Sequence, residues 1–198
     1  MAGPDETAYA GPMPARRTVL LINGLPGAGK TTLARPLAAE LRLPLFSRDV
    51  IKEAYVDVVG ADPPEGTDPR AWSHTVNGGA LSVMWALLAD APGGAVLDSS
   101  WVSTSRVVAE LGLSTAGVDD PYEVFCDVPL KLARRRYNRR APHRHRVHGA
   151  ALADETDWEF WGSAAEPLAL GPVRRVDTTR PVNVPDLAAK IRADLGAA

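Results

Sequence analysis

Cysteine is almost absent from this sequence, in which Cys126 is the only one among 198 residues. It lies in the apolar run Glu-Val-Phe-Cys-Asp-Val and is expected to be buried, so disulfides and cysteine-based metal sites are excluded. No apolar run approaches the roughly 18 to 20 residues that a membrane span requires. The first residues also lack the basic and then apolar layout of a signal peptide, and we therefore expect a cytoplasmic protein. Internal repeats are missing as well, which favours one domain.

The charged residues are unevenly distributed along the chain. The net charge is −2, yet residues 131–148 include eight Lys/Arg and no acid, so the rest of the chain is acidic. A basic block needs an anionic partner, either nucleic acid or the phosphates of a nucleotide. Because nucleic-acid-binding domains are normally basic overall, the confinement of positive charge to one segment favours a phosphate site and argues against nucleic acid.

Short apolar, β-branched runs alternate with longer helical stretches. We expect strands at 18–23, 44–46, 95–98, 122–127 and 173–176. We expect helices at about 30–42, 50–59, 72–90, 104–111, 129–140 and 185–195, with a short one near 155–165. Apolar strands that are each followed by a helix predict a parallel sheet covered on both faces, in a doubly wound α/β fold. Residues 1–15, rich in Pro, Gly and Ala, are expected to be a disordered tail before a single domain over 16–198.

Residues 24–31, Gly-Leu-Pro-Gly-Ala-Gly-Lys-Thr, match the phosphate-loop (P-loop) pattern G-x-x-x-x-G-K-[ST] between an expected strand and an expected helix. Glycines allow the backbone N–H groups to point at phosphate oxygens, and the helix N-terminus adds partial positive charge. Lys30 is expected to bind the β- and γ-phosphates of ATP or GTP, and the Thr31 hydroxyl to bind Mg²⁺. The predicted nucleotide contacts of this loop are Gly24, Gly27, Ala28, Gly29, Lys30, Thr31 and Thr32.

Two aspartates follow the second and third expected strands, at the edge of the sheet where ligands bind. Asp49 is the candidate base for the hydroxyl of a phosphoryl acceptor, with helix capping as the alternative. Arg48 and Lys52 beside it are candidate acceptor contacts. Asp98 is a candidate for holding Mg²⁺ or for positioning the acceptor, with a capped turn as the alternative. Trp101 is a candidate wall of the acceptor pocket, although burial in the core is the more frequent outcome for tryptophan.

An arginine-rich lid is expected over about 139–160. Arg136 and Arg140 lie one helical turn apart, and arginines that close over a substrate stabilise charge on a transferring phosphoryl group. A solvated basic helix face is the alternative. The three histidines between residues 143 and 148 lie among arginines and have no acids nearby in the sequence, which argues against a zinc site.

The loop after the last expected strand has the sequence Val-Asp-Thr-Thr-Arg-Pro. In this topology the loop lies beside the base of a nucleotide held by the P-loop. Asp177, Thr178 and Arg180 are therefore candidate base contacts, and Arg180 is able to stack on the ring. An ordinary capped turn is the alternative.

Together, the segments GLPGAGKTT, SRD, DSSW, CDVPLKLARRRYNRR and VDTTRP resemble the small P-loop kinases that include chloramphenicol phosphotransferase, zeta toxins, gluconate kinase and polynucleotide kinase. The resemblance covers about residues 18–195. It implies a P-loop kinase-like three-layer αβα sandwich with a parallel five-stranded sheet of order 2-3-1-4-5. It also implies that Asp49 is the acceptor base and that Arg136 and Arg140 are the lid arginines.

The sequence thus predicts an ATP- or GTP-dependent, Mg²⁺-dependent kinase that phosphorylates a hydroxyl of a small molecule, with an antibiotic as one candidate acceptor. A 5′-hydroxyl kinase of nucleic acid and a regulatory P-loop NTPase without an acceptor are the alternatives. The motif Asn-Lys-x-Asp of switch-type GTPases is absent. An assembly-forming ATPase should have an acid pair after the third strand, but Ser99 follows Asp98.

Overall fold

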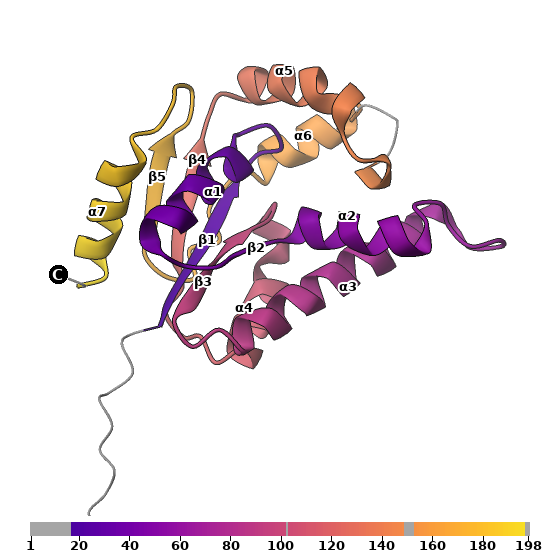
Figure 1. Cartoon of the computed structure of the whole chain (residues 1–198). Helices are drawn as coiled ribbons and strands as arrows, with labels where there is room; N and C mark the ends of the chain where they lie inside the picture. Colours follow the sequence, from indigo (N-terminus) through magenta and orange to yellow (C-terminus); the bar gives the residue numbers. More distant parts are fainter. Residues whose placement is uncertain (1–16, 102, 149–152, 197–198) are drawn as a thin grey trace, which may run out of the picture.

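Five parallel strands form one sheet at the centre of the molecule (Figure 1). The computed structural model describes residues 17–101, 103–148 and 153–196, so the predicted tail lies outside the described residues. The strands are β1 (Thr18–Gly24), β2 (Leu45–Ser47), β3 (Gly94–Asp98), β4 (Tyr122–Asp127) and β5 (Val173–Asp177). Their order in the sheet is β2-β3-β1-β4-β5, which confirms the predicted topology.

Seven α-helices connect the strands in the described part of the chain. They are α1 (Lys30–Leu41), α2 (Arg48–Val59), α3 (Pro69–Ala89), α4 (Arg106–Thr115), α5 (Leu130–Arg140), α6 (Glu155–Ser163) and α7 (Val184–Asp194). The clearest difference from the predicted bounds is in α4, which continues through Gly112 instead of ending before it. A Cβ at Gly112 would lie 2.1 Å from the ring of Trp85, so close packing against α3 explains a glycine inside this helix.

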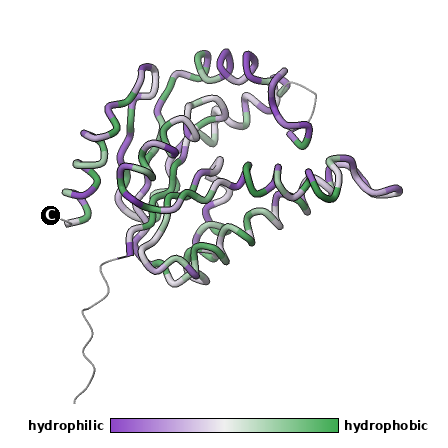
Figure 2. Tube along the Cα trace, viewed as in Figure 1, coloured by the Kyte–Doolittle hydropathy of each residue, from purple (hydrophilic) through white to green (hydrophobic). Residues whose placement is uncertain are grey.

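Successive residues of β1 pack into two separate cores. Leu20 and Ile22 lie in a core with residues of α1 and α7, whereas Val19 and Leu21 lie in a core with residues of α3 and α4. This alternation follows from the period of two in a strand, and it makes the sheet the middle layer of an αβα sandwich. Figure 2 shows the hydrophobic residues concentrated in the central strands and long hydrophilic stretches along α5.

Two parts of the chain face each other beyond the carboxyl ends of the strands. Helices α2 and α3 pack against each other on one side, and α5 and the segment that follows it lie on the other (Figure 1). Two cavities are lined by residues from both parts. None of the helices in the described residues is long and apolar enough to cross a membrane.

Candidate active site

The P-loop joins β1 to α1 and lines the first of three neighbouring cavities. Strand β1 ends at Gly24 and α1 begins at Lys30, as the motif requires. Gly27 has a φ of 86°, and a Cβ there would lie 2.2 Å from the backbone oxygen of Ala133 in α5. The loop is therefore packed directly against the helix that carries the predicted lid arginines. The predicted contacts Gly27, Gly29, Lys30, Thr31 and Thr32 line the cavities, whereas Gly24 and Ala28 form the buried back of the loop.

Gly27→Ala is expected to lower the free energy of unfolding of the nucleotide-free protein by about 3 kcal/mol, because left-handed strain adds to overpacking against α5. Gly29→Ala is the matched control. Gly29 has a similar φ of 93°, but a Cβ there would meet no atom within 4 Å. Its expected loss is only the strain, about 1–2 kcal/mol. Urea titrations of both variants test this prediction, and equal losses would show that contact with α5 does not constrain the loop.

Lys30 reaches back over the loop. Its Nζ donates hydrogen bonds to the carbonyl oxygens of Gly24, at 2.8 Å, and Leu25, at 3.0 Å. Burial lowers the pKa of Lys30, and the negative charge of Asp98 opposes this shift. An anion bound in the cavity would stabilise the charged ammonium further. Lys30 is thus a partly buried cation at the position that the motif assigns to a phosphate-binding lysine.

Asp98, only 4% exposed, ends β3 beside the P-loop. Its Oδ2 accepts hydrogen bonds from the hydroxyls of Thr31, at 2.7 Å, and Ser47, at 3.3 Å. The sheet brings these groups together because Ser47 and Asp98 are partners in the pairing of β2 with β3. Burial raises the pKa of Asp98, which the two hydrogen bonds and Lys30 counteract. The carboxylate therefore faces the P-loop hydroxyl and does not cap a turn.

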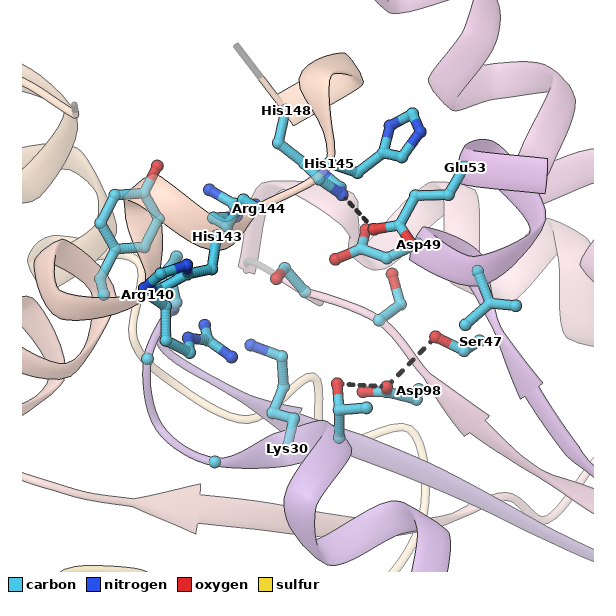
Figure 3. A pocket seen from close by; sticks show the side chains of 18 of the residues that line it. Lys30, Ser47, Asp49, Glu53, Asp98, Arg140, His143, Arg144, His145 and His148 are labelled. Atoms are coloured by element: carbon cyan, nitrogen blue, oxygen red, sulfur yellow. Dashed lines mark hydrogen bonds and ion pairs between the residues drawn. The ribbon is translucent and has the colours of Figure 1, made fainter. Parts of the chain in front are cut away.

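Asp49 lies in the first turn of α2, and Ser47 occupies the N-cap position. The side chain of Asp49 is 49% exposed and lies 3.8 Å from the guanidinium of Arg48. Burial raises the pKa of Asp49, but Arg48, His148, Lys52 and Lys30 lower it more, so the net pKa lies below the usual value. Asp49 is consequently ionised at neutral pH and is able to accept a proton. Figure 3 shows it across the cavity from Lys30.

The two predicted lid arginines have different surroundings. Arg136 donates hydrogen bonds to the backbone oxygens of Thr178, at 2.9 Å, and Thr179, at 3.0 Å, and lines only the second cavity. Arg140 lines both the first and the second cavity, and its guanidinium makes no hydrogen bond or ion pair within the described residues. Burial lowers the pKa of Arg140, and Arg144 lowers it further. Of the two, Arg140 is the arginine that faces the Lys30 side of the cavity (Figure 3).

Residues 143–148, the histidine-rich segment, contact α2 and the loop that follows it. Three side chains of this segment pair with acids: His148 with Glu53 at 2.7 Å, His145 with Asp57 at 2.9 Å and Arg146 with Asp62 at 3.1 Å. The acids that are missing near these histidines in the sequence are thus supplied by another part of the fold. Even so, no group of three or more His, Cys, Asp or Glu side chains in the described residues is arranged to hold a metal ion.

The second cavity, of about 420 Å³, lies between α1, α5 and the loop after β5. Thr178 and Arg180 line it, together with Thr32 of the P-loop and Arg136. The predicted contact Asp177 does not line this cavity. Its carboxylate accepts a hydrogen bond from the backbone N–H of Thr179 at 2.8 Å and stabilises the turn, which is the capping alternative.

The third cavity, of about 490 Å³, adjoins the first. The predicted acceptor contacts Arg48, Asp49 and Lys52 line it. Trp101 does not, because it is 3% exposed and packs against Trp85 in the core, with ring centroids 5.6 Å apart. This tryptophan therefore lies in the buried position that is the more frequent one for its residue type.

Several residues that line the third cavity were missed by the sequence analysis. They are Trp72, Asn77, Tyr137, Arg144 and Trp161. Trp72 and Asn77 come from α3, whose packing against α2 has no short-range sequence signal. Arg144 was flagged only as part of the basic segment. The one available sequence signal is the presence of aromatic residues in helices near basic residues. This signal includes the aromatic residues of the cavity but does not distinguish them from other aromatic residues.

Known structures resemble this chain along most of its length. A crystal structure of a candidate kinase from Chloroflexus aurantiacus is 27% identical, with a TM-score of 0.74 over 90% of this chain and 98% of that one. A gluconokinase from Sinorhizobium meliloti is 16% identical, with a TM-score of 0.56 over 91% of this chain and 98% of that one. The tunicamycin resistance protein of Deinococcus radiodurans is 19% identical, with a TM-score of 0.55 over 92% and 98%. No curated protein sequence matches the chain significantly.

The fold and the P-loop define the class: this is an α/β protein with the fold of small-molecule P-loop kinases. A family model described as an AAA domain matches residues 19–159, which is most of the chain. The chain belongs to this AAA domain family of P-loop kinases. Membership implies nucleotide binding.

Proposed function

We propose that this protein transfers the γ-phosphoryl group of ATP or GTP to a hydroxyl of a small molecule. The observation that carries the proposal is the position of Asp49, which lines both the first cavity, referred to below as the P-loop cavity, and the adjoining third cavity. A hydroxyl in the third cavity would meet both this carboxylate and a γ-phosphate bound by Lys30. A regulatory NTPase without an acceptor would need neither the third cavity nor a carboxylate at its boundary.

In this reaction the acceptor oxygen attacks the γ-phosphorus while the bond from phosphorus to the β,γ-bridging oxygen breaks. Asp49 accepts the hydroxyl proton, and the products are a phosphate monoester and a nucleoside diphosphate. The transition state is loose, so the alcohol is deprotonated late and a base with a low pKa is sufficient. The cations around Asp49 therefore do not prevent this role, since they keep it in the ionised form that accepts the proton.

The oxygens of Thr31 and Asp98 fit a Mg²⁺ ion that accompanies the triphosphate. The Thr31 hydroxyl and the Asp98 carboxylate lie 2.7 Å apart in the P-loop cavity, and Mg²⁺ prefers oxygen ligands of this kind. A Mg²⁺ that is shared with phosphates needs only one or two protein ligands, so these two residues are enough. When bound, the ion would neutralise charge on the β- and γ-phosphate oxygens.

We propose a lid over about 139–160, which includes Arg140, and we assign different roles to Arg140 and to Arg136, which lies one helical turn before it in α5. Arg140→Ala is expected to lower kcat by about 10²-fold with little change in nucleotide KM, because its guanidinium would meet charge that develops on the transferring group. Arg136→Ala is the matched variant one helical turn away. It should mainly raise the nucleotide KM, since Arg136 donates hydrogen bonds to the backbone of the loop beside the second cavity, where the nucleotide base would lie.

Steady-state kinetics of both variants, with labelled ATP and any acceptor found by the screen below, separate these roles. If Arg140→Ala raises only KM, Arg140 binds the ground state and the assignment of a transition-state role to it is incorrect. If Arg136→Ala loses kcat as strongly as Arg140→Ala, the two arginines act together, as the family resemblance implies.

An acceptor screen tests the proposed function. The protein is incubated with γ-labelled ATP or GTP, Mg²⁺ and a panel of hydroxylated antibiotics, hydroxy acids, nucleosides and 5′-hydroxyl oligonucleotides. We expect a phosphate monoester of a small molecule, detected by mass spectrometry. Labelled oligonucleotide as the dominant product would support the nucleic-acid kinase, and release of phosphate to water alone would support the regulatory NTPase. Either result would overturn the proposal. Antibiotics are in the panel because an antibiotic is one of the predicted acceptors.

A further inference from the structure

The third cavity has an excess of positive charge at its wall. Arg48, Lys52 and Arg144 line it, and Asp49 is the only carboxylate among its lining residues. Arg48 lies 3.8 Å from Asp49, so this carboxylate already has a cationic neighbour. Neither Lys52 nor Arg144 has a carboxylate within ion-pair distance among the described residues. The wall therefore includes two cations that have no counter-ion of their own.

Lys52 is the strongest observation, because a lysine that is only 6% exposed is rarely left without an acid. Its Nζ donates one hydrogen bond, to Asn77 Oδ1 at 3.2 Å, and an ammonium has three N–H donors. Burial lowers the pKa of Lys52, as do Arg48 and Arg144, whereas Asp49 opposes the shift. A buried cation without a carboxylate at ion-pair distance is costly for the fold, and an anionic ligand would reduce this cost.

Other donors at the same wall are also unsatisfied. Arg48 Nε and Trp72 Nε1 are buried and have no hydrogen-bond partner in the described part of the chain. Buried donors are normally paired, so two unpaired ones beside one cavity point to an acceptor group that arrives with a ligand. The guanidinium of Arg144 lies over the ring of Tyr137, with its carbon 5.0 Å from the ring centroid, and this contact does not neutralise its charge.

We propose that Arg48, Lys52 and Arg144 form a subsite for an oxyanion group, a carboxylate or a phosphate ester, that the acceptor carries in addition to its hydroxyl. That the ligand is a phosphoryl acceptor rests on the proposed function. That the subsite binds an anion is inferred from the charges of the cavity alone. The volume of about 490 Å³ fits one small molecule, and Trp72, Trp161 and Tyr137 provide aromatic walls for its carbon skeleton. The acceptor is therefore a hydroxylated organic acid or phosphate ester.

Binding of four probes with one ring and different polar groups tests the subsite. Benzoate, phenyl phosphate, benzamide and benzyl alcohol are titrated by NMR into the protein saturated with a non-hydrolysable ATP analogue and Mg²⁺, which occupies the P-loop. At least one anion is expected to bind about tenfold more tightly than both neutral compounds, because it makes charge-assisted hydrogen bonds. The anion that binds more tightly identifies the group that the acceptor carries.

Lys52→Met should remove most of this preference, since it keeps the length of the side chain but not the charge. Lys190→Met, which removes an exposed lysine of α7 that pairs with Asp186, is the matched control and should keep the preference. Arg144→Gln provides a second test at a less buried position if Lys52→Met does not fold by circular dichroism. Equal binding of anionic and neutral probes, or a preference that survives in both Lys52→Met and Arg144→Gln, would overturn the subsite.

Different experimental results would contradict the proposed subsite and the proposed kinase activity. If the acceptor screen shows neutral alcohols phosphorylated as well as their acidic counterparts, the subsite is overturned and the kinase stands. If the anion preference is present and depends on Lys52, but no compound in the panel is phosphorylated, the subsite stands and the kinase is overturned.

Discussion

Lys30→Ala is expected to lower kcat by about 10³-fold or more and to weaken binding of the triphosphate, because the variant lacks the cation that would meet the β- and γ-phosphates. Within the described residues, the ammonium of the free protein donates hydrogen bonds to the backbone oxygens of Gly24 and Leu25, and burial lowers its pKa. Its removal therefore takes an unfavourably buried charge out of the cavity and should leave the fold intact. Transfer from labelled ATP, calorimetric titration with ATP and Mg²⁺, and circular dichroism measure the three quantities.

The control for this variant is Lys190→Ala, which removes an exposed lysine of α7 from the opposite end of the chain. It should retain both turnover and nucleotide affinity. Lys30→Met adds a second comparison, because it keeps most of the side-chain volume and separates the loss of charge from the loss of packing. Unchanged turnover in Lys30→Ala, with a normal dichroism spectrum, would rule out the P-loop as the nucleotide site.

Asp49→Asn is expected to lower kcat by about 10² to 10⁴-fold while nucleotide affinity and fold survive. Asparagine keeps the size of the side chain but does not accept the hydroxyl proton. Because Ser47 and not Asp49 is the N-cap of α2, the substitution removes no helix cap. Because the pKa of Asp49 is lowered, this carboxylate should stay ionised at every pH above the usual pKa range of an aspartate. The wild-type rate should therefore not fall through protonation of Asp49 in that range of pH. Rates measured from pH 5 to 8 with the acceptor found by the screen test both statements.

The variant Asp98→Asn distinguishes the proposed role of Asp98 from that of Asp49. Burial raises the pKa of Asp98, so its ionised form destabilises the nucleotide-free protein at neutral pH, and the neutral variant should be at least as stable as wild type. Its effect on catalysis should be a changed dependence on Mg²⁺ concentration, since Asp98 accepts the Thr31 hydrogen bond. If Asp49→Asn retains most activity and Asp98→Asn loses it at saturating Mg²⁺, the base is Asp98 and the assignment is reversed.

The sequence by itself determined the class of fold and the phosphate end of the site. Strands β1 and β4 contain short apolar runs at residues 19–22 and 124–126, and the P-loop has fixed glycines and a lysine at fixed spacing, so both signals are local in the chain. The sheet order followed from the family resemblance and was confirmed. The sequence also selected Asp49, because parallel strands place all their carboxyl ends at one edge and Asp49 directly follows one of them.

Only the tertiary structure decided which side chains surround the carboxyl ends of the strands. Trp101 lies in the core and Trp72 lies at the third cavity, and the residues beside each of them in the sequence do not predict this difference. The acids that pair with the histidines of residues 143–148 come from α2 and its following loop, about a hundred residues away along the chain. Arg136 and Arg140 differ for the same reason, since among the described residues the loop after β5 accepts hydrogen bonds from Arg136 and none from Arg140. Contacts between distant segments depend on how helices pack on the sheet, and that packing is set by the summed fit of many side chains, which no single stretch of sequence encodes.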